Sequence, residues 1–429
     1  MGGIRAVRTA KRLTGSLVCA AAACLTLACG RASNGQEAER QDPELERKVE
    51  QLLPRIEKFT NLPVRRRPEV RRSSAQTLEA YLLERLKAEY PGDTLAAVAE
   101  AYRAFGLIPD TLDLRQLLVD LLLEQAVGYY DPGRDILYVR DDAAPLLVDA
   151  VLVHELVHAL QDQEADLDRL LSSLPGNDQR TAAQSALEGH ATLAMLSFQL
   201  NLGAAGLPEL SPEMAGALVG ASQFPRLAEA PAIIRDPLLF AYLGGARYVQ
   251  RLWRNQEGSP PPLGIWLPKS TEQLLHTEKI LEIPDIPLSL SIAQPQDGWR
   301  VRYARDLGEL EIRIYFEEHL EHQALAARAA AGWDGDAYAL VTRDGRQALV
   351  WYTAWDSQAD AQEFADAYRA AFRARFGETE EAEELVAGGR RAQLERLSID
   401  GTPVVLVVES DADVQVARPP ELRIGAIGG

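Results

Sequence analysis

Cysteine and methionine are scarce in this chain of 429 residues, which has three of each. The cysteines are Cys19, Cys24 and Cys29, so the chain beyond residue 29 cannot form an internal disulfide bond. Beyond residue 28 the sequence also lacks an uncharged apolar run long enough to span a bilayer. These absences exclude a fold stabilised by disulfides and argue against an internal membrane span.

Positive charge is also in short supply, with 45 lysines and arginines against 63 acidic residues and a net charge of −18. The first 28 residues carry four basic and no acidic side chains, so the remainder has a net charge of −22. Such a surface repels nucleic acid, which argues against a role in binding DNA or RNA. The hydrophobic content of 47% is that of a globular protein, and the length favours two folded units.

The first 28 residues have the pattern of an export signal. Arg5, Arg8, Lys11 and Arg12 form a basic start, and the uncharged apolar stretch 13–28 follows it. A basic region followed by an apolar segment of this length is typical of a signal peptide, which is removed during export. We therefore expect the folded protein to be exported from the cytoplasm.

The end of this signal reads Leu-Thr-Leu-Ala-Cys-Gly over residues 25–30. A small residue before a cysteine at this place resembles the lipobox of bacterial lipoproteins, in which the cysteine becomes the lipidated first residue. The resemblance implies a lipid anchor on Cys29 and a polar tether over residues 29–45. Because Gly30 rather than aspartate follows the cysteine, it also implies an outer-membrane location. Ordinary cleavage near Ala28 is the alternative.

Apolar residues repeat at helical spacing in the first two thirds of the chain, for example at Leu78, Leu82 and Leu86. The helices predicted in this way cover residues 42–60, 143–163 and 180–200 and parts of 75–127 and 204–285. Between them, residues 128–139 contain two β-rich runs around an Asp-Pro-Gly turn, which predicts a strand hairpin.

The pattern changes near residue 286, where strand candidates begin to alternate with helices. The strands are predicted at 337–343, 347–355, 392–398 and 402–409, and the helices at 308–331 and 358–375. This alternation predicts an α+β fold with an antiparallel sheet and helices on one face. We expect a mainly helical domain over residues 46–285 and a smaller α+β domain over 286–429.

His154 and His158 stand four residues apart in the segment His-Glu-Leu-Val-His, inside the helix predicted over 143–163. Four residues make about one turn plus 40°, so both imidazoles project from one side of the helix and can hold one metal ion. Glu155 lies about 100° further round, where its carboxylate can reach a water molecule beside that ion. The segment therefore predicts a zinc site with an adjacent general base.

The next predicted helix contains Ala-Leu-Glu-Gly-His-Ala-Thr over residues 186–192. Together with the His-Glu-Leu-Val-His segment, it resembles the gluzincin metallopeptidases, in which a glutamate on the next helix is the third zinc ligand. The resemblance covers about residues 120–200 and implies a zincin-like fold in which Glu188 binds Zn²⁺ with His154 and His158. Thr192 stands where thermolysin-like members have an aspartate behind the first histidine, so the subfamily is not identified.

His190 is the alternative third ligand. Residues two apart on a helix point to nearly opposite sides, so Glu188 and His190 cannot both face the ion. Gly189 permits a close approach of backbones beside Glu188, which favours the glutamate. Asp162, one turn beyond His158, either supports a ligand histidine through a hydrogen bond or is a solvated acid at the helix end.

Several polar residues outside the motif have predicted roles. His276 follows a helix-cap pattern at Ser270 and is the predicted donor to the oxyanion of the reaction, with Tyr242 as the second candidate. A surface histidine is the alternative for His276. Two further sets have open roles: substrate binding or core packing for Tyr129, Tyr130 and Tyr138, and a tight turn or calcium binding for Asp334 and Asp336.

These patterns predict a zinc metallopeptidase that hydrolyses peptide bonds of peptides or proteins at the cell envelope. Zn²⁺ bound by His154, His158 and Glu188 activates water, and Glu155 moves the proton. The alternative is a non-catalytic zinc-binding envelope lipoprotein that acts as a binding or scaffold module. The presence of Glu155 favours the enzyme.

Overall fold

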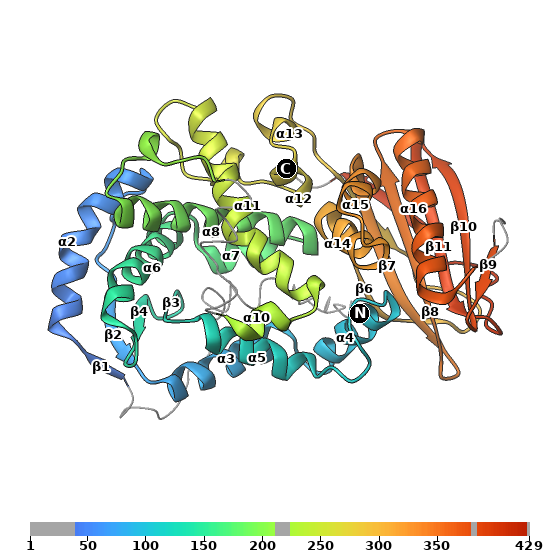
Figure 1. Ribbon diagram of the computed structural model, residues 1–429, viewed down its shortest axis with the longest axis horizontal. Helices are drawn as coiled ribbons and strands as arrows, with labels where there is room; N and C mark the ends of the chain where they lie inside the picture. The colour runs from blue at the N-terminus through green and yellow to red at the C-terminus, as the bar shows by residue number, and fades with distance from the viewer. Residues whose placement is uncertain (1–38, 211–223, 379–383, 427–429) are drawn as a thin grey trace, which may run out of the picture.

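The computed structural model of the chain describes residues 39–210, 224–378 and 384–426. The expected signal peptide, Cys29 and the start of the expected tether lie outside the described residues. Helices fill most of the first two thirds of the described chain and a large antiparallel sheet dominates the last third, which confirms the predicted α+β class. Figure 1 shows this sheet at one end of the molecule and helix α2 (Pro43–Thr60) at the other. None of the helices in these three ranges is long and apolar enough to cross a bilayer.

Some helices of the first part begin at residues whose side chains accept hydrogen bonds from free backbone N–H groups. The Asp42 side chain accepts hydrogen bonds from the N–H groups of Glu44 and Leu45 at the start of α2, and Ser74 accepts one from Thr77 in α3 (Ala75–Glu89). The other helices described before residue 286 are α4 (Thr94–Ala104), α5 (Leu114–Gln125), α6 (Pro145–Ala165), α7 (Leu167–Ser173), α8 (Asn177–Leu200), α10 (Pro225–Glu229), α11 (Ala232–Asn255), α12 (Thr271–Leu275) and α13 (Glu278–Leu281), with 3₁₀ turns η2 (Ala204–Gly206) and η3 (Gly264–Trp266).

A small sheet with the strand order β1-β2-β4-β3 lies beside α6. Its strands are β1 (Glu39–Gln41), β2 (Glu69–Ser73), β3 (Gly128–Asp131) and β4 (Ile136–Arg140). Strands β3 and β4 form the predicted antiparallel hairpin, while β2 pairs with β4 in parallel. Tyr129 stacks on both Tyr81 and Tyr138 with ring centroids 4.7 Å apart, so Tyr129 and Tyr138 serve in core packing.

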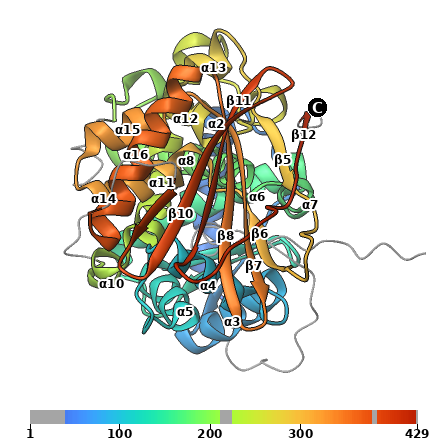
Figure 2. The same cartoon turned by 90° about the vertical axis from the view of Figure 1, so that its right-hand side faces the viewer.

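The large sheet has six strands in the order β6-β7-β8-β11-β10-β9, and every neighbouring pair is antiparallel. The strands are β6 (Arg300–Arg305), β7 (Trp333–Arg343), β8 (Arg346–Trp355), β9 (Glu384–Ala387), β10 (Arg390–Ile399) and β11 (Thr402–Asp411). Figure 2 shows helices α14 (Gly308–Leu320), α15 (Gln323–Ala330) and α16 (Gln358–Phe376) on one face of this sheet. The antiparallel pair of β5 (Leu288–Ile292) and β12 (Leu422–Ala426) lies on the opposite side.

The apolar core continues across the domain boundary that we expected near residue 285. One cluster of buried side chains runs from Leu78 in α3 to Val407 in β11. Phe105, which follows α4, packs edge-on against Tyr338 and Trp351 of the large sheet, with ring centroids 5.1 and 5.2 Å apart. Residue 285 lies in the loop between α13 and β5, and the parts of the chain on either side of it share one core.

Carboxylates at this junction hold the starts of two helices. The Asp306 carboxylate lies 2.7 Å from the backbone nitrogen of Asn177 and 3.0 Å from that of Asp178, at the start of α8. Asp336 accepts hydrogen bonds from the backbone N–H groups of Leu307 and Gly308 at the start of α14. It also accepts hydrogen bonds from two indole N–H groups, those of Trp333 and Trp351.

Of the two roles that the sequence offered for Asp334 and Asp336, the tight turn is wrong. Both residues belong to strand β7, and the register of its pairing with β8 shifts between Trp333 and Gly335. The sequence Gly-Trp-Asp-Gly-Asp resembles a turn locally, but pairing with β8 extends it. Four N–H donors surround the oxygens of Asp336.

Candidate metal centre

Helix α6 carries His154, Glu155 and His158 in its middle and is buried around most of its circumference. The exposed fractions of these three residues are 8%, 4% and 1%. The hairpin packs tightly on the same helix, since a β carbon on Gly128 would lie 2.5 Å from the Val151 side chain. Polar side chains buried at such a place require polar partners.

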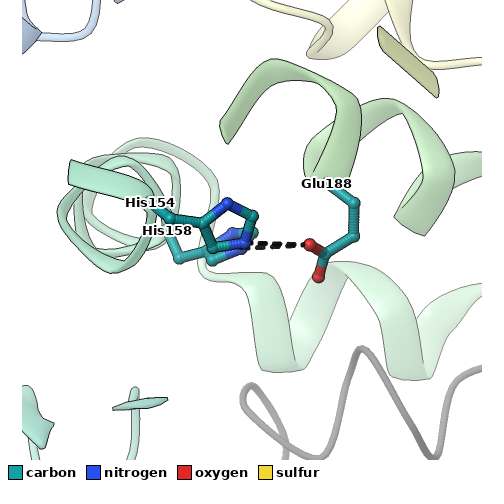
Figure 3. A group of neighbouring side chains, drawn as sticks. All are labelled: His154, His158 and Glu188. Atoms are coloured by element: carbon teal, nitrogen blue, oxygen red, sulfur yellow. Dashed lines mark hydrogen bonds and ion pairs between the residues drawn. The ribbon is translucent and has the colours of Figure 1, made fainter. Parts of the chain in front are cut away.

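Glu188 on α8 is the partner that meets both histidines. Its Oε2 atom lies 3.1 Å from His154 Nε2 and 3.4 Å from His158 Nε2, and the two Nε2 atoms are 3.1 Å apart. Figure 3 shows the two imidazoles projecting from one helix toward the carboxylate on the other. One potential ligand atom of each residue lies within 4.8 Å of the others, so the three predicted ligands form one group. We call these three residues the His–His–Glu group.

Two glycines bring α8 and α11 into backbone contact beside the His–His–Glu group. A β carbon on Gly189 would lie 2.0 Å from the carbonyl carbon of Gly245, and one on Gly245 would lie 1.7 Å from the carbonyl oxygen of Ser185. Only glycine permits this approach, because any side chain would overlap the facing backbone. The contact also places Tyr242 on α11 with its ring centroid 6.1 Å from that of His154.

The charges of Glu188 and His158 stabilise one another. Burial by itself raises the pKa of Glu188, but His158 and His154 outweigh burial and lower this pKa to about 2. Burial lowers the pKa of His158, but the Glu188 carboxylate outweighs it and raises this pKa to about 9. Without a metal ion, the group is thus a buried ion pair.

Glu155 has a carboxylate oxygen that the described chain does not satisfy. The Oε2 atom is buried and has no hydrogen-bond partner among the described residues, while the backbone N–H of Tyr130 donates to the carboxylate. Burial raises the pKa of Glu155, against the effect of His154 and His158. An unsatisfied buried oxygen carries a desolvation cost, and it leaves Glu155 able to accept a proton or hydrogen bond from another molecule.

Gln161, rather than Asp162, is the residue that contacts a ligand histidine. Gln161 Oε1 lies 2.9 Å from His158 Nδ1. Asp162 instead accepts hydrogen bonds from the Tyr130 hydroxyl and the backbone N–H of Leu167, each at 3.0 Å. Sequence reasoning missed Gln161, although side chains three residues apart on a helix are neighbours and the spacing could have revealed it.

His190 is fully buried on α8 but lies outside the His–His–Glu group. Its Nδ1 is 3.4 Å from Gln161 Nε2, and its ring packs edge-on against Trp253 with centroids 5.7 Å apart. Burial lowers the pKa of His190 to about 3, so its imidazole is neutral. The geometry therefore favours Glu188 over His190 as the third ligand.

The structure does not bring His276 into the His–His–Glu group. His276 follows α12, and its Nε2 lies 2.8 Å from Oε1 of Glu309 on α14, a contact that raises the pKa of His276. Tyr242, the second candidate from the sequence, is the one that lies beside His154. Tyr242 lies beside the group because α11, which carries it, crosses α8 next to Glu188. Helix α12, which His276 follows, packs instead at the start of α8 and on α14.

A second group of acidic residues consists of Glu272, Asp285 and Asp356, whose oxygens also lie within 4.8 Å of one another. The Lys279 ammonium lies among them, 2.5 Å from Glu272, 2.9 Å from Asp285 and 2.7 Å from Asp356. A lysine thus already provides the positive charge at this place.

Comparisons with known proteins bear on the last third of the chain. A family described as a domain of unknown function (DUF8575) matches residues 299–418. Neither the curated proteins nor the solved structures gave a match. The matched range contains α14 to α16 and the six-stranded sheet, and the His–His–Glu group lies outside it.

Proposed function

We propose that this protein is a zinc-dependent metallopeptidase that hydrolyses peptide bonds of peptides or proteins at the cell envelope. The observation that carries the proposal is the convergence of His154, His158 and Glu188 at one buried point. Two imidazole nitrogens and one carboxylate oxygen are the protein ligands of catalytic zinc sites in which one position stays open. Zinc in such a site supplies Lewis acidity toward water and toward a substrate carbonyl.

Glu155 supports a catalytic rather than a purely structural site. Its buried Oε2 has no partner among the described residues and can accept a proton from the attacking water. The same carboxyl group can then deliver this proton to the amine that leaves as the peptide bond breaks. A non-catalytic scaffold has no use for such a residue, so Glu155 favours the enzyme over that alternative.

Tyr242 is the residue that we assign to the substrate carbonyl. Its ring lies 6.1 Å from that of His154 between centroids. Burial, with the negative charges of Glu188 and Glu155, raises the pKa of Tyr242 well above its ordinary value, so the phenol keeps its proton. A protonated hydroxyl at this place can donate a hydrogen bond to the oxyanion that develops during peptide hydrolysis.

The test combines metal analysis of the purified protein with mass-spectrometric cleavage profiles on a proteome-derived peptide library. We expect about one zinc per chain and cleavage that stops with a chelator and returns with added zinc. Glu155→Gln should keep the zinc and lose about 10²- to 10⁴-fold in turnover, the usual contribution of a general base. Undiminished cleavage by this variant would reject the proposed mechanism.

Ligand variants extend the same test. His154→Ala and Glu188→Ala should each abolish stoichiometric zinc binding, because each removes one of three protein ligands. His190→Ala is the matched control for Glu188→Ala, since His190 is also buried on α8 but lies outside the group. Zinc loss in the His190 variant together with zinc retention in the Glu188 variant would assign the third position to His190.

We also propose that Cys29 carries a lipid that anchors the protein in the outer membrane. The supporting observation is the segment Leu-Ala-Cys-Gly at the end of the apolar stretch 13–28. Cys29→Ala should move the protein from the membrane fraction to the soluble fraction in its native host, measured by fractionation and immunoblotting. A variant that stays with the membrane would contradict the anchor.

A further inference from the structure

We propose that Gln161 is a positioning residue for the metal centre. Its side chain holds His158 through the Nδ1 atom and connects this ligand to the helix that carries Glu188. The inference rests on the proposed zinc site. Gln161 is fully buried, with Oε1 2.9 Å from His158 Nδ1 and Nε2 3.1 Å from the carbonyl oxygen of Leu187. It belongs to α6, and Leu187 directly precedes Glu188 on α8.

The contact with Leu187 determines which way the Gln161 amide is turned. A backbone carbonyl oxygen can only accept a hydrogen bond, so the amide nitrogen of Gln161 must face Leu187. The amide oxygen then faces His158 Nδ1, where it can only accept. The hydrogen-bond partners determine this orientation, because the oxygen and nitrogen ends of an amide have similar shapes and shape alone does not distinguish them.

The orientation of the amide in turn selects the tautomer of His158. Because Gln161 Oε1 accepts, His158 Nδ1 must carry the proton and donate it. The lone pair of a neutral His158 then lies on Nε2, the atom that faces His154 Nε2 at 3.1 Å and Glu188 Oε2 at 3.4 Å. A nitrogen with its lone pair directed into the His–His–Glu group is the form that binds a metal ion.

Gln161 also connects the two helices that provide the ligands. One end of its amide holds a ligand on α6, and the other end holds the residue next to a ligand on α8. The amide nitrogen lies 3.4 Å from His190 Nδ1 as well, so both of its hydrogens can have acceptors. A shift of either helix would therefore strain the hydrogen bonds that orient His158.

Variants of Gln161 separate this role from a general contribution to folding. Gln161→Met keeps much of the side-chain volume and removes the hydrogen bonds to His158, Leu187 and His190, while Gln161→Glu keeps an acceptor for His158 Nδ1 but loses the amide donor. The matched control is Gln163→Met, because Gln163 also bridges α6 to another segment through backbone groups of Arg65 and Arg66 but does not touch a ligand.

Zinc affinity, measured by competition with a chromophoric chelator, and the visible absorption of the cobalt-substituted protein are the readouts. We expect Gln161→Met to weaken zinc binding about 10- to 100-fold and to change the cobalt spectrum. Gln161→Glu, which keeps the acceptor but loses the donor to Leu187, should recover only part of the affinity, and Gln163→Met should match the wild type in both measurements. Wild-type affinity and an unchanged spectrum in Gln161→Met would overturn the inference.

A measurement on the zinc-loaded wild type keeps the inference testable if Gln161→Met does not fold. Long-range ¹⁵N–¹H spectra of histidine-labelled protein should show His158 protonated at Nδ1 and unprotonated at Nε2. The reverse assignment would overturn the role of Gln161 and leave the proposed zinc site intact. Absence of zinc or cobalt binding in the wild type would overturn the proposed function and the role of Gln161 with it.

Discussion

At the scale of single residues, Tyr242 and His276 differ in what surrounds them. The Tyr242 ring lies beside His154, and burial together with the charges of Glu188 and Glu155 raises the pKa of Tyr242 and keeps its phenol protonated. His276 Nε2 instead donates a hydrogen bond to the Glu309 carboxylate, on the side of the molecule where α12 meets α14. From its position in the chain His276 is the first candidate, but of these two residues it is Tyr242 that lies against the His–His–Glu group.

Tyr242→Phe should therefore keep its zinc and lose about 10²- to 10³-fold in turnover, the scale of one oxyanion donor. His276→Ala, as the control, should keep turnover close to that of the wild type. Steady-state peptide cleavage by zinc-loaded proteins measures both. A large loss in the His276 variant with a normal Tyr242 variant would restore the assignment made from the sequence.

At the scale of elements, the crossing of α8 and α11 sets the geometry of the site. Glu188 is next to Gly189, and Tyr242 is three residues before Gly245, so the backbone contact of the two glycines positions both side chains. The helices are close because neither has a side chain at the contact. A wider separation would move Tyr242 away from His154.

Gly245→Ala should destabilise the protein by about 1–3 kcal/mol, the usual cost of overpacking, because its β carbon would overlap the Ser185 carbonyl. It should also weaken zinc binding, since α8 must shift. Gly203→Ala is the control, because no atom of another described residue lies within 4 Å of its β carbon apart from its chain neighbours, and it should change stability by less than about 0.5 kcal/mol. Denaturant unfolding measures the difference, and equal stability of the two variants would contradict the close contact.

At the scale of the whole molecule, the part that matches the domain of unknown function supports the helix that carries Glu188. Asp306 accepts hydrogen bonds from the start of α8, and Arg375 on α16 donates one to the carbonyl oxygen of Ala104 at 2.8 Å. Phe105 inserts its ring among aromatic residues of the large sheet. The shared core makes it unfavourable to separate the two parts in water.

We therefore expect the chain that ends at residue 285 to lose cooperative thermal unfolding and stoichiometric zinc, although it keeps all three predicted ligands. Truncation exposes the apolar cluster around Phe105 and removes Asp306 from the start of α8. Calorimetry and metal analysis of this fragment check the expectation. A cooperative transition in a zinc-loaded fragment would show that residues 46–285 fold on their own, as the sequence pattern suggested.

The sequence by itself determined the features that depend on the spacing of residues close together in the chain. The four-residue separation of His154 and His158 places both imidazoles on one side of any helix, and alternating apolar residues around Asp-Pro-Gly are sufficient for the hairpin of β3 and β4. Strands β7, β8, β10 and β11 and helix α16 follow from similar local patterns. Strands β5, β6, β9 and β12 were not predicted, and the helix predicted over 308–331 is divided into α14 and α15. Glu188 and His190 are two residues apart and point to nearly opposite sides of one helix, so local spacing also shows that they cannot both bind the same ion.

Only the tertiary structure decided which residues from distant segments meet. It placed Gln161 between His158 and Leu187, Tyr242 beside His154, and Asp306 at the start of α8. It also paired β2 in parallel with β4, although the two strands are separated by three helices and β3. These contacts depend on how helices cross and where the core closes, and local spacing carries no information about either.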